Sequence, residues 1–249
     1  MFQADILRQA GIAILFMPGM DGTGISFEPL QALLPDDIPV TIIRYPSDSL
    51  LDFDETVQCA KNQIQSDMGD VIVIAESFSG PVAVSLVGTG QLKAKYLILC
   101  ATFARSPRPV LLNIFRWLPI EFLMSLPLPR LLLRLRIEGG PATTDLFLAM
   151  WKRVKTLVPL KTLAHRLRVI HKVDVRRWLP AIKIPCLYIQ ATADKTVPES
   201  CLSDFTQSIT DLRVEKITGP HFILQAQPEL CLAAILNFVE HVSKRVVKS

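Results

Sequence analysis

The sequence Val71-Ile-Val-Ile-Ala-Glu-Ser-Phe-Ser-Gly80 places a serine directly after a run of β-branched residues. A helix-like segment follows at residues 81–87, so the pattern predicts a strand, a sharp turn and a helix with Ser77 at the apex. The hydroxyl of a serine in such a turn stands clear of the sheet, and the next backbone N–H, that of Phe78, can point at an oxyanion. The helix N-terminus also favours negative charge. This arrangement suits a nucleophile, whereas a serine that only caps the helix is the simpler alternative.

The turn around Ser77 departs from the common nucleophile motif G-x-S-x-G. In such a turn the helix passes close to neighbouring strands, so the residues two before and two after the serine must be small. Here these residues are Ala75 and Ser79, and Gly80 follows. Because the side chains stay small, we interpret this segment as a variant of the motif and not as its loss.

A second motif lies in residues 12–24, where an apolar strand runs into a loop with the three glycines Gly19, Gly22 and Gly24. Such a loop can bring backbone N–H groups close to a ligand. The phosphate-binding patterns G-x-x-x-x-G-K-[ST] and G-x-G-x-x-G are both absent. The role that fits is the second half of an oxyanion hole, with the backbone N–H of Met20 as donor. A plain turn is the alternative.

A serine nucleophile needs a base, and the base needs a carboxylate that orients it. Three of the four histidines lie in basic or charged helical stretches: His165, His171 and His241. His221 differs, because it follows a strand-like run at residues 212–217 and lies in a loop that opens onto the final helix. We therefore predict His221 as the base, with an ordinary loop histidine as the alternative.

The carboxylate is expected one strand before the base. Residues 187–191 read as that strand, and Asp194 lies in the loop directly after it. The chain order is then Ser77, Asp194, His221, which is the order expected of α/β-hydrolases. Each of the three lies beyond the C-terminal end of a predicted parallel strand, where open α/β sheets bind ligands. Asp194 alone could be an ordinary turn aspartate, but the three residues in this order favour a catalytic triad.

The chain resembles the α/β-hydrolase superfamily along nearly its whole length. Four motifs carry the resemblance: Phe16-Met-Pro-Gly-Met-Asp-Gly-Thr-Gly24, Ala75-Glu-Ser-Phe-Ser-Gly80, Ala193-Asp-Lys-Thr-Val-Pro198 and Gly219-Pro-His221. The family commonly has His-Gly before the oxyanion residue, where this chain has Pro18-Gly19, and the nucleophile motif lacks both flanking glycines. The glycine loop paired with a Glu-Ser-Phe turn also resembles the esterase/acyltransferase branch that includes plant phytyl ester synthases.

Strand-like and helix-like runs alternate along the chain, which is typical of a mostly parallel sheet flanked by helices. The strand-like runs are residues 12–17, 40–44, 71–75, 96–100, 186–190 and 213–217. The helix-like runs are residues 27–34, 54–66, 79–88, 199–208 and 228–244. The alternation breaks at residues 103–183, the cap segment, where amphipathic runs replace strands. We predict an α/β-hydrolase core of residues 1–102 and 184–249, with the cap segment as an inserted helical lid.

The cap segment is unusually basic. It contains 16 Lys or Arg and 4 Asp or Glu, a formal charge of +12, whereas the rest of the chain has 11 and 19, a charge of −8. It is also rich in leucine. A basic, apolar helical surface fits an acyl-chain pocket with a cationic rim, and it suits peripheral contact with an anionic membrane. A solvated face with a basic bias is the alternative. We expect no nucleic-acid binding, because neither a recognised fold signature nor interleaved aromatic residues accompany the charge.

The cysteines and the N-terminus indicate the compartment. Five scattered cysteines without a C-x-x-C pair favour a reducing environment and argue against a zinc site or a disulfide framework. The N-terminus lacks the basic region of a signal peptide. No uncharged apolar run reaches the roughly 18 residues of a membrane span. We therefore predict a cytoplasmic protein without a transmembrane helix.

Together these patterns predict a serine hydrolase, a carboxylesterase that cleaves an ester or thioester of an apolar acyl group. In this interpretation Ser77 attacks the carbonyl, His221 transfers the proton, Asp194 orients the imidazole, and the backbone N–H groups of Met20 and Phe78 bind the oxyanion. We expect no metal and no organic cofactor. Two alternatives stay open: an acyltransferase that uses the same triad, and a non-catalytic homologue that binds its ligand with these residues. The sequence does not distinguish acyl-chain length, leaving group or oligomeric state.

Overall fold

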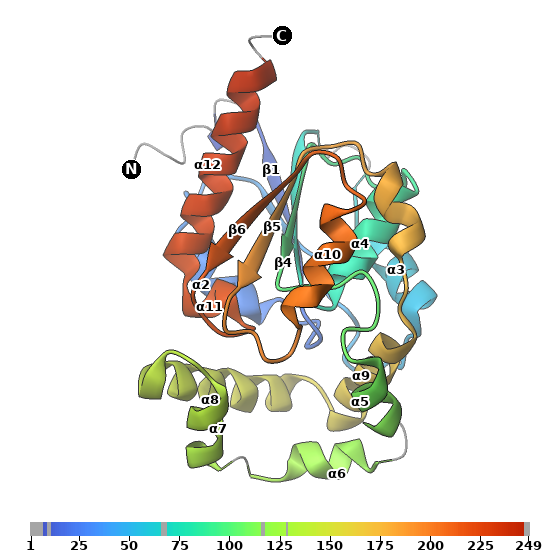
Figure 1. Cartoon of the computed structure of the whole chain (residues 1–249), viewed down its shortest axis with the longest axis vertical. Coiled ribbons are helices and arrows are strands. Elements are labelled where there is room, and N and C mark those ends of the chain that lie inside the picture. Colours follow the sequence, from blue (N-terminus) through green and yellow to red (C-terminus); the bar gives the residue numbers. More distant parts are fainter. Residues whose placement is uncertain (1–6, 9–10, 66–68, 116–117, 128, 247–249) are drawn as a thin grey trace.

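The computed structural model describes residues 7–8, 11–65, 69–115, 118–127 and 129–246. Within them the chain forms a six-stranded sheet in the order β2-β1-β3-β4-β5-β6, and every neighbouring pair is parallel (Figure 1). The strands are β1 (Ala13–Met17), β2 (Val40–Ile42), β3 (Val71–Glu76), β4 (Tyr96–Cys100), β5 (Cys186–Ala191) and β6 (Leu212–Ile217). The predicted α/β-hydrolase fold, with its mostly parallel sheet and flanking helices, is confirmed.

The strand order reverses between β1 and β3. The chain moves from β1 outward to β2 and then returns to the other side of β1, from where β3 to β6 continue in the opposite direction. Open α/β sheets bind ligands beyond the carboxyl ends of the strands at such a reversal. The loop after β1 carries Met20, and the turn after β3 carries Ser77. The topology therefore brings both predicted halves of the oxyanion hole to the same edge of the sheet.

Helices cover both faces of the sheet, because side chains of successive strand residues point to opposite sides. In β3, Val71 and Val73 pack in one buried cluster, whereas Ile72 and Ile74 pack in the other. The first cluster is covered by α3 (Phe53–Asn62), α4 (Ser79–Gly88) and α10 (Leu202–Thr206), and the second by α2 (Glu28–Gln31), α11 (Ile223–Ala226) and α12 (Pro228–Val246) (Figure 1). The sheet is thus the middle layer of three.

Helix boundaries agree with the predicted runs to within a few residues, with two informative differences. The helix predicted at 27–34 is a short helical turn at Ile25–Phe27 followed by the four residues of α2. The helix predicted at 54–66 ends at Asn62, and residues 66–68 lie outside the described residues. The start of α3 is specified by a capping box, in which Asp52 accepts from the Glu55 N–H and the Glu55 carboxylate accepts from the Asp52 N–H.

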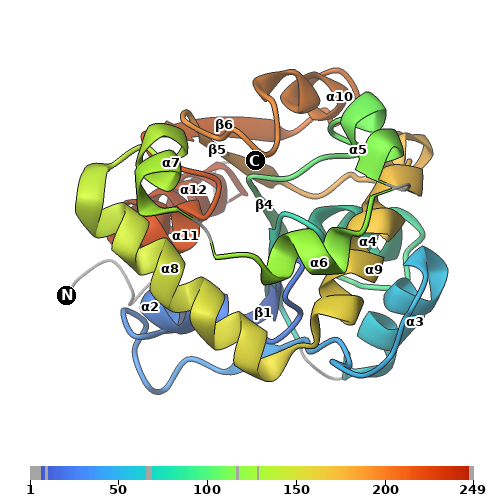
Figure 2. The same ribbon diagram turned by 90° about the horizontal axis from the view of Figure 1, so that it is seen from below.

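The described part of the cap segment is mostly helical, and its helices lie below the carboxyl edge of the sheet (Figures 1 and 2), except for a 3-10 turn at Arg176–Ala181 that packs beside the end of α4. Its helices are α5 (Pro109–Phe115), α6 (Ile120–Ser125), α7 (Arg130–Arg136), α8 (Gly140–Leu157), α9 (Leu160–Lys172) and a 3-10 turn at Arg176–Ala181. An isolated antiparallel bridge between Arg105 and Asp174, which the sequence did not predict, joins its two ends. The division into core and cap stays a prediction, since Val169 and Ile170 of α9 pack in the same buried cluster as the sheet.

No helix in the described part of the chain is both long enough and apolar enough to cross a bilayer.

Candidate active site

Ser77 lies in a strained turn between β3 and α4. Its φ of +48° falls in the left-handed region, which costs a residue with a side chain roughly 1–2 kcal/mol. Two hydrogen bonds hold the turn: the Ser77 N–H donates to the Cys100 carbonyl at 2.9 Å, and the Thr102 hydroxyl donates to the Ser77 carbonyl at 2.5 Å. The Tyr188 hydroxyl in turn donates to the Thr102 carbonyl at 2.6 Å. Neighbouring strands therefore stabilise the conformation that exposes the Ser77 hydroxyl.

The unusual Ser79-Gly80 pair has a physical explanation. The Ser79 hydroxyl donates to the Pro18 carbonyl, so the Tyr45 hydroxyl, 2.6 Å away, must be the donor to Ser79 Oγ. This ties the serine turn to the loop after β1. The close approach that usually requires glycine falls one residue later, because a Cβ at Gly80 would lie 1.9 Å from Thr102 Oγ1. The variant motif thus keeps one glycine where space is lacking and places a buried hydroxyl at position 79.

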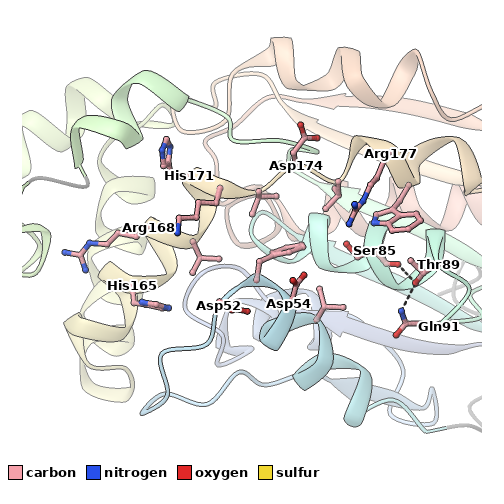
Figure 3. Close-up of a pocket in the computed structure, with 17 residues that line it drawn as sticks. Asp52, Asp54, Ser85, Thr89, Gln91, His165, Arg168, His171, Asp174 and Arg177 are labelled. Atoms are coloured by element: carbon pink, nitrogen blue, oxygen red, sulfur yellow. Dashed lines mark hydrogen bonds between the residues drawn. The ribbon is translucent and has the colours of Figure 1, made fainter.

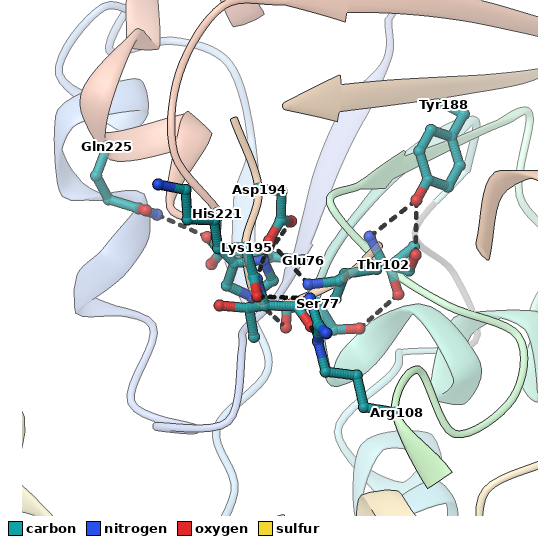
Figure 4. Close-up of polar contacts among 11 residues, drawn as sticks. Glu76, Ser77, Thr102, Arg108, Tyr188, Asp194, Lys195, His221 and Gln225 are labelled. Atoms are coloured by element: carbon teal, nitrogen blue, oxygen red, sulfur yellow. Dashed lines mark hydrogen bonds and ion pairs between the residues drawn. The ribbon is translucent and has the colours of Figure 1, made fainter. Parts of the chain in front are cut away.

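The structure brings Ser77, His221 and Asp194 together (Figure 4). Ser77 Oγ lies 2.9 Å from His221 Nε2, and His221 Nδ1 lies 2.6 Å from Asp194 Oδ2. Asp194 Oδ1 accepts from the N–H groups of Thr196 at 2.7 Å and Val197 at 2.8 Å, which fix the carboxylate. A carboxylate can only accept here, so His221 carries its proton on Nδ1 and presents Nε2 as an acceptor to the Ser77 hydroxyl.

The protonation of His221 is set by two opposing effects. Burial acts to lower the pKa of His221, but the hydrogen bond and negative charge of Asp194, together with the charge of Glu76, outweigh burial and raise the pKa above its ordinary value of 6.5. The Asp194 side chain is only 5% exposed, so its charge is poorly screened by water. The imidazolium form of His221 is therefore favoured more than in a free histidine.

Two further carboxyl groups, those of Glu76 and Asp21, lie at the edge of the site. Gln225 Nε2 donates to Glu76 Oε1 at 2.9 Å and to the Ser26 carbonyl at 2.8 Å, and burial raises the pKa of Glu76. Asp21 accepts from the Thr23 N–H at 2.9 Å and from the Thr23 hydroxyl. These contacts connect the loops around the site, and neither carboxyl hydrogen-bonds to Ser77 or His221 among the contacts of the described residues.

The loop that carries Met20 is fixed from both sides. On one side the Gly22 N–H donates to the Gly19 carbonyl at 3.1 Å. On the other side Arg166 of α9 donates to the carbonyls of Met20 at 3.0 Å and Asp21 at 2.6 Å. In the described part of the chain, the backbone N–H of Met20 donates no hydrogen bond, and the same holds for Phe78. Both remain available to an oxyanion, although the Phe78 ring itself packs away from the site, edge-on against Tyr45.

The sequence analysis missed Arg166. The spacing of the sequence could have indicated that Arg166 is buried, because Leu163, Arg166 and Ile170 recur at helical intervals on the buried face of α9. An arginine among buried positions of an amphipathic helix indicates a specific partner rather than a solvated charge.

A cavity of about 640 Å³ opens beside Ser77 and His221. Its wall is mostly apolar and comes from the sheet edge and from the cap segment: Met20, Phe103, Leu111, Phe147, Met150, Trp151, Val154, Leu163, Leu167, Ile170, Val197 and Phe222. Three buried polar atoms in this wall have no partner among the described residues: Ser26 Oγ, Trp151 Nε1 and Gln225 Oε1. The cavity therefore suits a largely apolar ligand with a few polar atoms.

A second cavity, of about 760 Å³, lies on the other side of α9, between α3 and α4 (Figure 3). Its wall combines apolar side chains with charged ones of both signs, among them Asp54, Arg168 and Arg177. It contains Ser85 and His165, but His165 Nε2 contacts the Leu51 carbonyl at 3.0 Å rather than a serine. No group of three or more His, Cys, Asp or Glu residues in the described ranges could hold a metal ion.

Comparisons with known proteins agree with this architecture. The enol-lactonase from Burkholderia xenovorans is similar in structure over 94% of this chain and 93% of its own, with a TM-score of 0.73 and 17% sequence identity. The esterase from Exiguobacterium antarcticum is similar over 92% of each chain, with a TM-score of 0.71 and 14% identity. At such low identity these similarities show the fold alone.

Comparisons of the sequence, in addition to the fold, indicate the family of the chain. Phytyl ester synthase 1, chloroplastic, of Arabidopsis thaliana is 25% identical over 122 residues, which are 46% of this chain and 17% of that protein. The alignment therefore spans about a sixth of the relative's length. The model of the alpha/beta hydrolase family matches residues 14–234, from the first strand to the last helix. The chain belongs to the alpha/beta hydrolase family.

Proposed function

We propose that the protein is a serine hydrolase that cleaves an ester or thioester of an apolar acyl group through an acyl-enzyme. The observation that carries the proposal is the chain of contacts from Ser77 Oγ to His221 and Asp194 at the mouth of a mostly apolar cavity. Nucleophile, base and orienting acid within hydrogen-bond reach of one another are the arrangement that acyl transfer requires.

In the first half of the reaction, Ser77 Oγ attacks the carbonyl carbon of the substrate while its proton passes to His221 Nε2. The negative charge that develops on the carbonyl oxygen is bound by the N–H groups of Met20 and Phe78. The tetrahedral intermediate then collapses, and His221 donates the proton to the departing alcohol or thiol. The product of this half-reaction is an acyl ester on Ser77.

In the second half, water replaces the leaving group. His221 Nε2 accepts a proton from the water as its oxygen attacks the acyl carbonyl, and the same proton then returns to Ser77 Oγ as the carboxylic acid departs. Asp194 keeps the His221 proton on Nδ1 and stabilises the imidazolium in both halves. The raised pKa of His221 fits this role, because it reflects that stabilisation.

The substrate class follows from the cavity. Its volume lies within the roughly 300–1,000 Å³ of small-molecule sites, and aromatic and aliphatic side chains form most of its wall. We therefore propose that this apolar wall binds the acyl group of the substrate. Arg108 at its rim donates to the carbonyls of Thr196 at 3.1 Å and Lys195 at 2.9 Å, so it fixes the loop that follows Asp194.

The test combines labelling and turnover. A fluorophosphonate should label Ser77 covalently, and p-nitrophenyl esters of increasing acyl length should be hydrolysed, with kcat/KM rising as the chain fills the apolar cavity. The variant Ser77→Ala should lose both properties. A fluorophosphonate that labels neither Ser77 nor any other residue would favour the non-catalytic, ligand-binding alternative.

An acyltransferase is the second candidate, and the similarity to a protein named phytyl ester synthase is the observation that favours it. The same acyl-enzyme would then be resolved by an alcohol instead of water. Adding a long-chain alcohol during turnover separates the two reactions, because an acyltransferase should form the new ester in preference to free acid. Exclusive release of the acid would leave hydrolysis as the reaction.

A further inference from the structure

We propose that helices α5–α7 of the cap segment dock on the surface of an anionic lipid bilayer. Seven of the eleven large hydrophobic side chains that are exposed among the described residues lie within residues 110–132. We call these seven the docking face: Val110, Leu111, Leu118, Phe122, Leu123, Leu126 and Leu132. Val110 is 76% exposed and Phe122 is 61% exposed, whereas such residues are usually covered.

The docking face lies on the outside of the molecule, at the side where the catalytic edge of the sheet opens. Helices α6 and α7 form the lowest layer in Figure 1 and face the viewer in Figure 2, on the far side of the cap segment from the sheet. Each of the three helices has only six or seven residues, too few to span a bilayer but enough to lie in its interface.

The charge of the cap segment indicates what kind of partner the docking face would bind. The docking face belongs to a segment with 16 basic and 4 acidic residues, and the exposed Arg130 and Arg134 of α7 and Glu121 of α6 accompany its apolar side chains. An apolar surface on a segment with a large basic excess is complementary to anionic headgroups above acyl chains. This basic excess favours an anionic bilayer over a protein partner whose interface would pair charges of both signs.

The docking face also continues into the catalytic cavity. Leu111 is 42% exposed on the surface and at the same time lines the cavity beside Ser77. A lipid acyl ester held in the bilayer could then enter the cavity along apolar surface without crossing water. This step rests on the proposed function, whereas the docking itself does not.

The experiment measures vesicle binding of the full chain carrying Ser77→Ala, so that hydrolysis cannot alter the lipids. We expect co-sedimentation with vesicles of phosphatidylcholine and phosphatidylglycerol and weak binding to pure phosphatidylcholine. Adding Phe122→Ser and Leu132→Ser should weaken binding about tenfold or more, because two large apolar side chains no longer enter the interface. The matched control is Leu230→Ser, which changes a 53% exposed leucine on α12 and should leave binding unchanged.

Two results would overturn the proposal. One is equal binding by the parent and the Phe122/Leu132 variant when both unfold at the same temperature. The other is a stable dimer in solution that the same two substitutions dissociate, since the docking face would then be covered by a second copy. Vesicle binding is measured without turnover. A failure of vesicle binding therefore does not bear on the esterase activity, and an absence of esterase activity does not bear on vesicle binding.

A second inference rests on Arg166, which is 5% exposed and forms no ion pair with another described residue. Its guanidinium donates instead to three backbone carbonyls, those of Met20, Asp21 and Pro46. A buried cation whose guanidinium contacts no carboxylate at ion-pair distance is costly, so its retention indicates a specific task. The fit is tight as well, because a Cβ at Gly22 would lie 2.6 Å from Arg166 Nη1.

We infer that Arg166 is a positioning residue for the oxyanion hole. It holds the Met20 carbonyl while the Gly22 N–H holds the Gly19 carbonyl, so the peptide that presents the Met20 N–H is restrained on both sides. Arg166 does not touch the reacting atoms; it acts through Met20. This inference also rests on the proposed function.

The variants Arg166→Met and Arg166→Lys test this role. Removing one oxyanion donor costs other hydrolases about 10²–10³ in kcat, so misplacing one should cost about 10- to 100-fold with KM changed little. Affinity for a boronic acid, which mimics the tetrahedral state, should fall in parallel, and Arg166→Lys should recover part of both losses. The control Arg168→Met alters an arginine of the same helix that faces the second cavity.

A KM increase at constant kcat, or a kcat loss without loss of boronic-acid affinity, would overturn the positioning role. The Lys variant keeps the charge, so it provides a folded protein for this measurement if Arg166→Met does not fold. A wild-type protein that a fluorophosphonate does not label would instead refute the proposed function.

Discussion

The carboxyl edge of the sheet and the outer helices of the cap segment differ in how their residues are held. At the edge, Ser77 and Asp194 are fixed by backbone hydrogen bonds, and their chain neighbours Ala75, Phe78 and Val197 are buried. In α5–α7, most described side chains are exposed, and the only described buried residue is Ile120. The difference teaches that the residues to which we assign the chemistry are held in place by several contacts each, whereas most described side chains of α5–α7 are exposed and held by few.

If this contrast holds, the largest loss of activity should come from the serine itself. Ser77→Ala should lower kcat by on the order of 10⁴ to 10⁶ without unfolding the protein, because it removes the nucleophile and leaves the fold-forming contacts. The matched control is Ser85→Ala, a serine of the second cavity, which should keep full activity. Steady-state kinetics on a p-nitrophenyl ester decide this, and comparable rates for parent and Ser77→Ala would locate the nucleophile elsewhere.

The second-largest loss of activity is expected from replacing the acid of the triad. Asp194→Asn should reduce kcat by roughly 10⁴, because an amide at this position can no longer hold the His221 proton on Nδ1. The controls are Asp174→Asn and Asp204→Asn, whose carboxylates contact Arg176 and Arg105 instead of a histidine. A larger loss for either control than for Asp194→Asn would contradict the assignment of the acid.

The third prediction concerns the tight packing of the edge. Gly80→Ala should destabilise the fold by about 3 kcal/mol, on the order of a 100-fold fall in the folded-to-unfolded ratio, since the new Cβ would collide with Thr102. Ser85→Ala on the same helix should change the free energy of unfolding little. Urea denaturation measures both, and equal stability of Gly80→Ala and the parent would mean that Thr102 can move away without cost.

The fourth prediction tests the electrostatic interaction between Asp194 and His221. His221 must be neutral to accept the serine proton, so kcat/KM should fall about tenfold per pH unit below the pKa of His221 and level off above it. Because Asp194 raises that pKa, the midpoint should lie above 6.5. The measurement is a pH profile on a neutral ester, and a midpoint below 6.5 would show that burial outweighs the charge of Asp194.

The smallest effect is expected in the cap segment. Arg134→Gln with Lys152→Gln should raise KM for an anionic acyl substrate about two- to fivefold and flatten its salt dependence, because exposed charges act weakly and are screened. A neutral short-chain ester should be unaffected. Lys61→Gln with Lys93→Gln serves as the control on the core. Equal effects on both substrates would make the basic face ordinary solvated surface.

The six strands and the turn at Ser77 were predictable from the sequence, because both are local patterns that a few neighbouring residues determine. The positions of Asp194 and His221 were predictable from chain order, since each follows a strand that ends at the same edge of the sheet. The roles we assign to these residues stay predictions until activity is measured.

The supporting contacts were not predictable in the same way. Arg166 and Asp21 lie 145 residues apart, and Gln225 and Glu76 lie 149 residues apart, so no local pattern joins them. The role of Ser79 was hidden for a similar reason. Its hydroxyl contacts Pro18 after β1 and Tyr45 after β2, which are distant in sequence, and the sequence shows only that the side chain is small.

The contact between Ser77 and His221 links residues 144 positions apart and has a consequence for folding. Contacts of long sequence separation close large loops and are expected to form late, after β6 has joined the sheet. A chain that has formed β1 to β4 can already present the serine turn, but its serine has no base. Reactivity of Ser77 toward a fluorophosphonate during refolding would therefore report the moment at which the last strand docks.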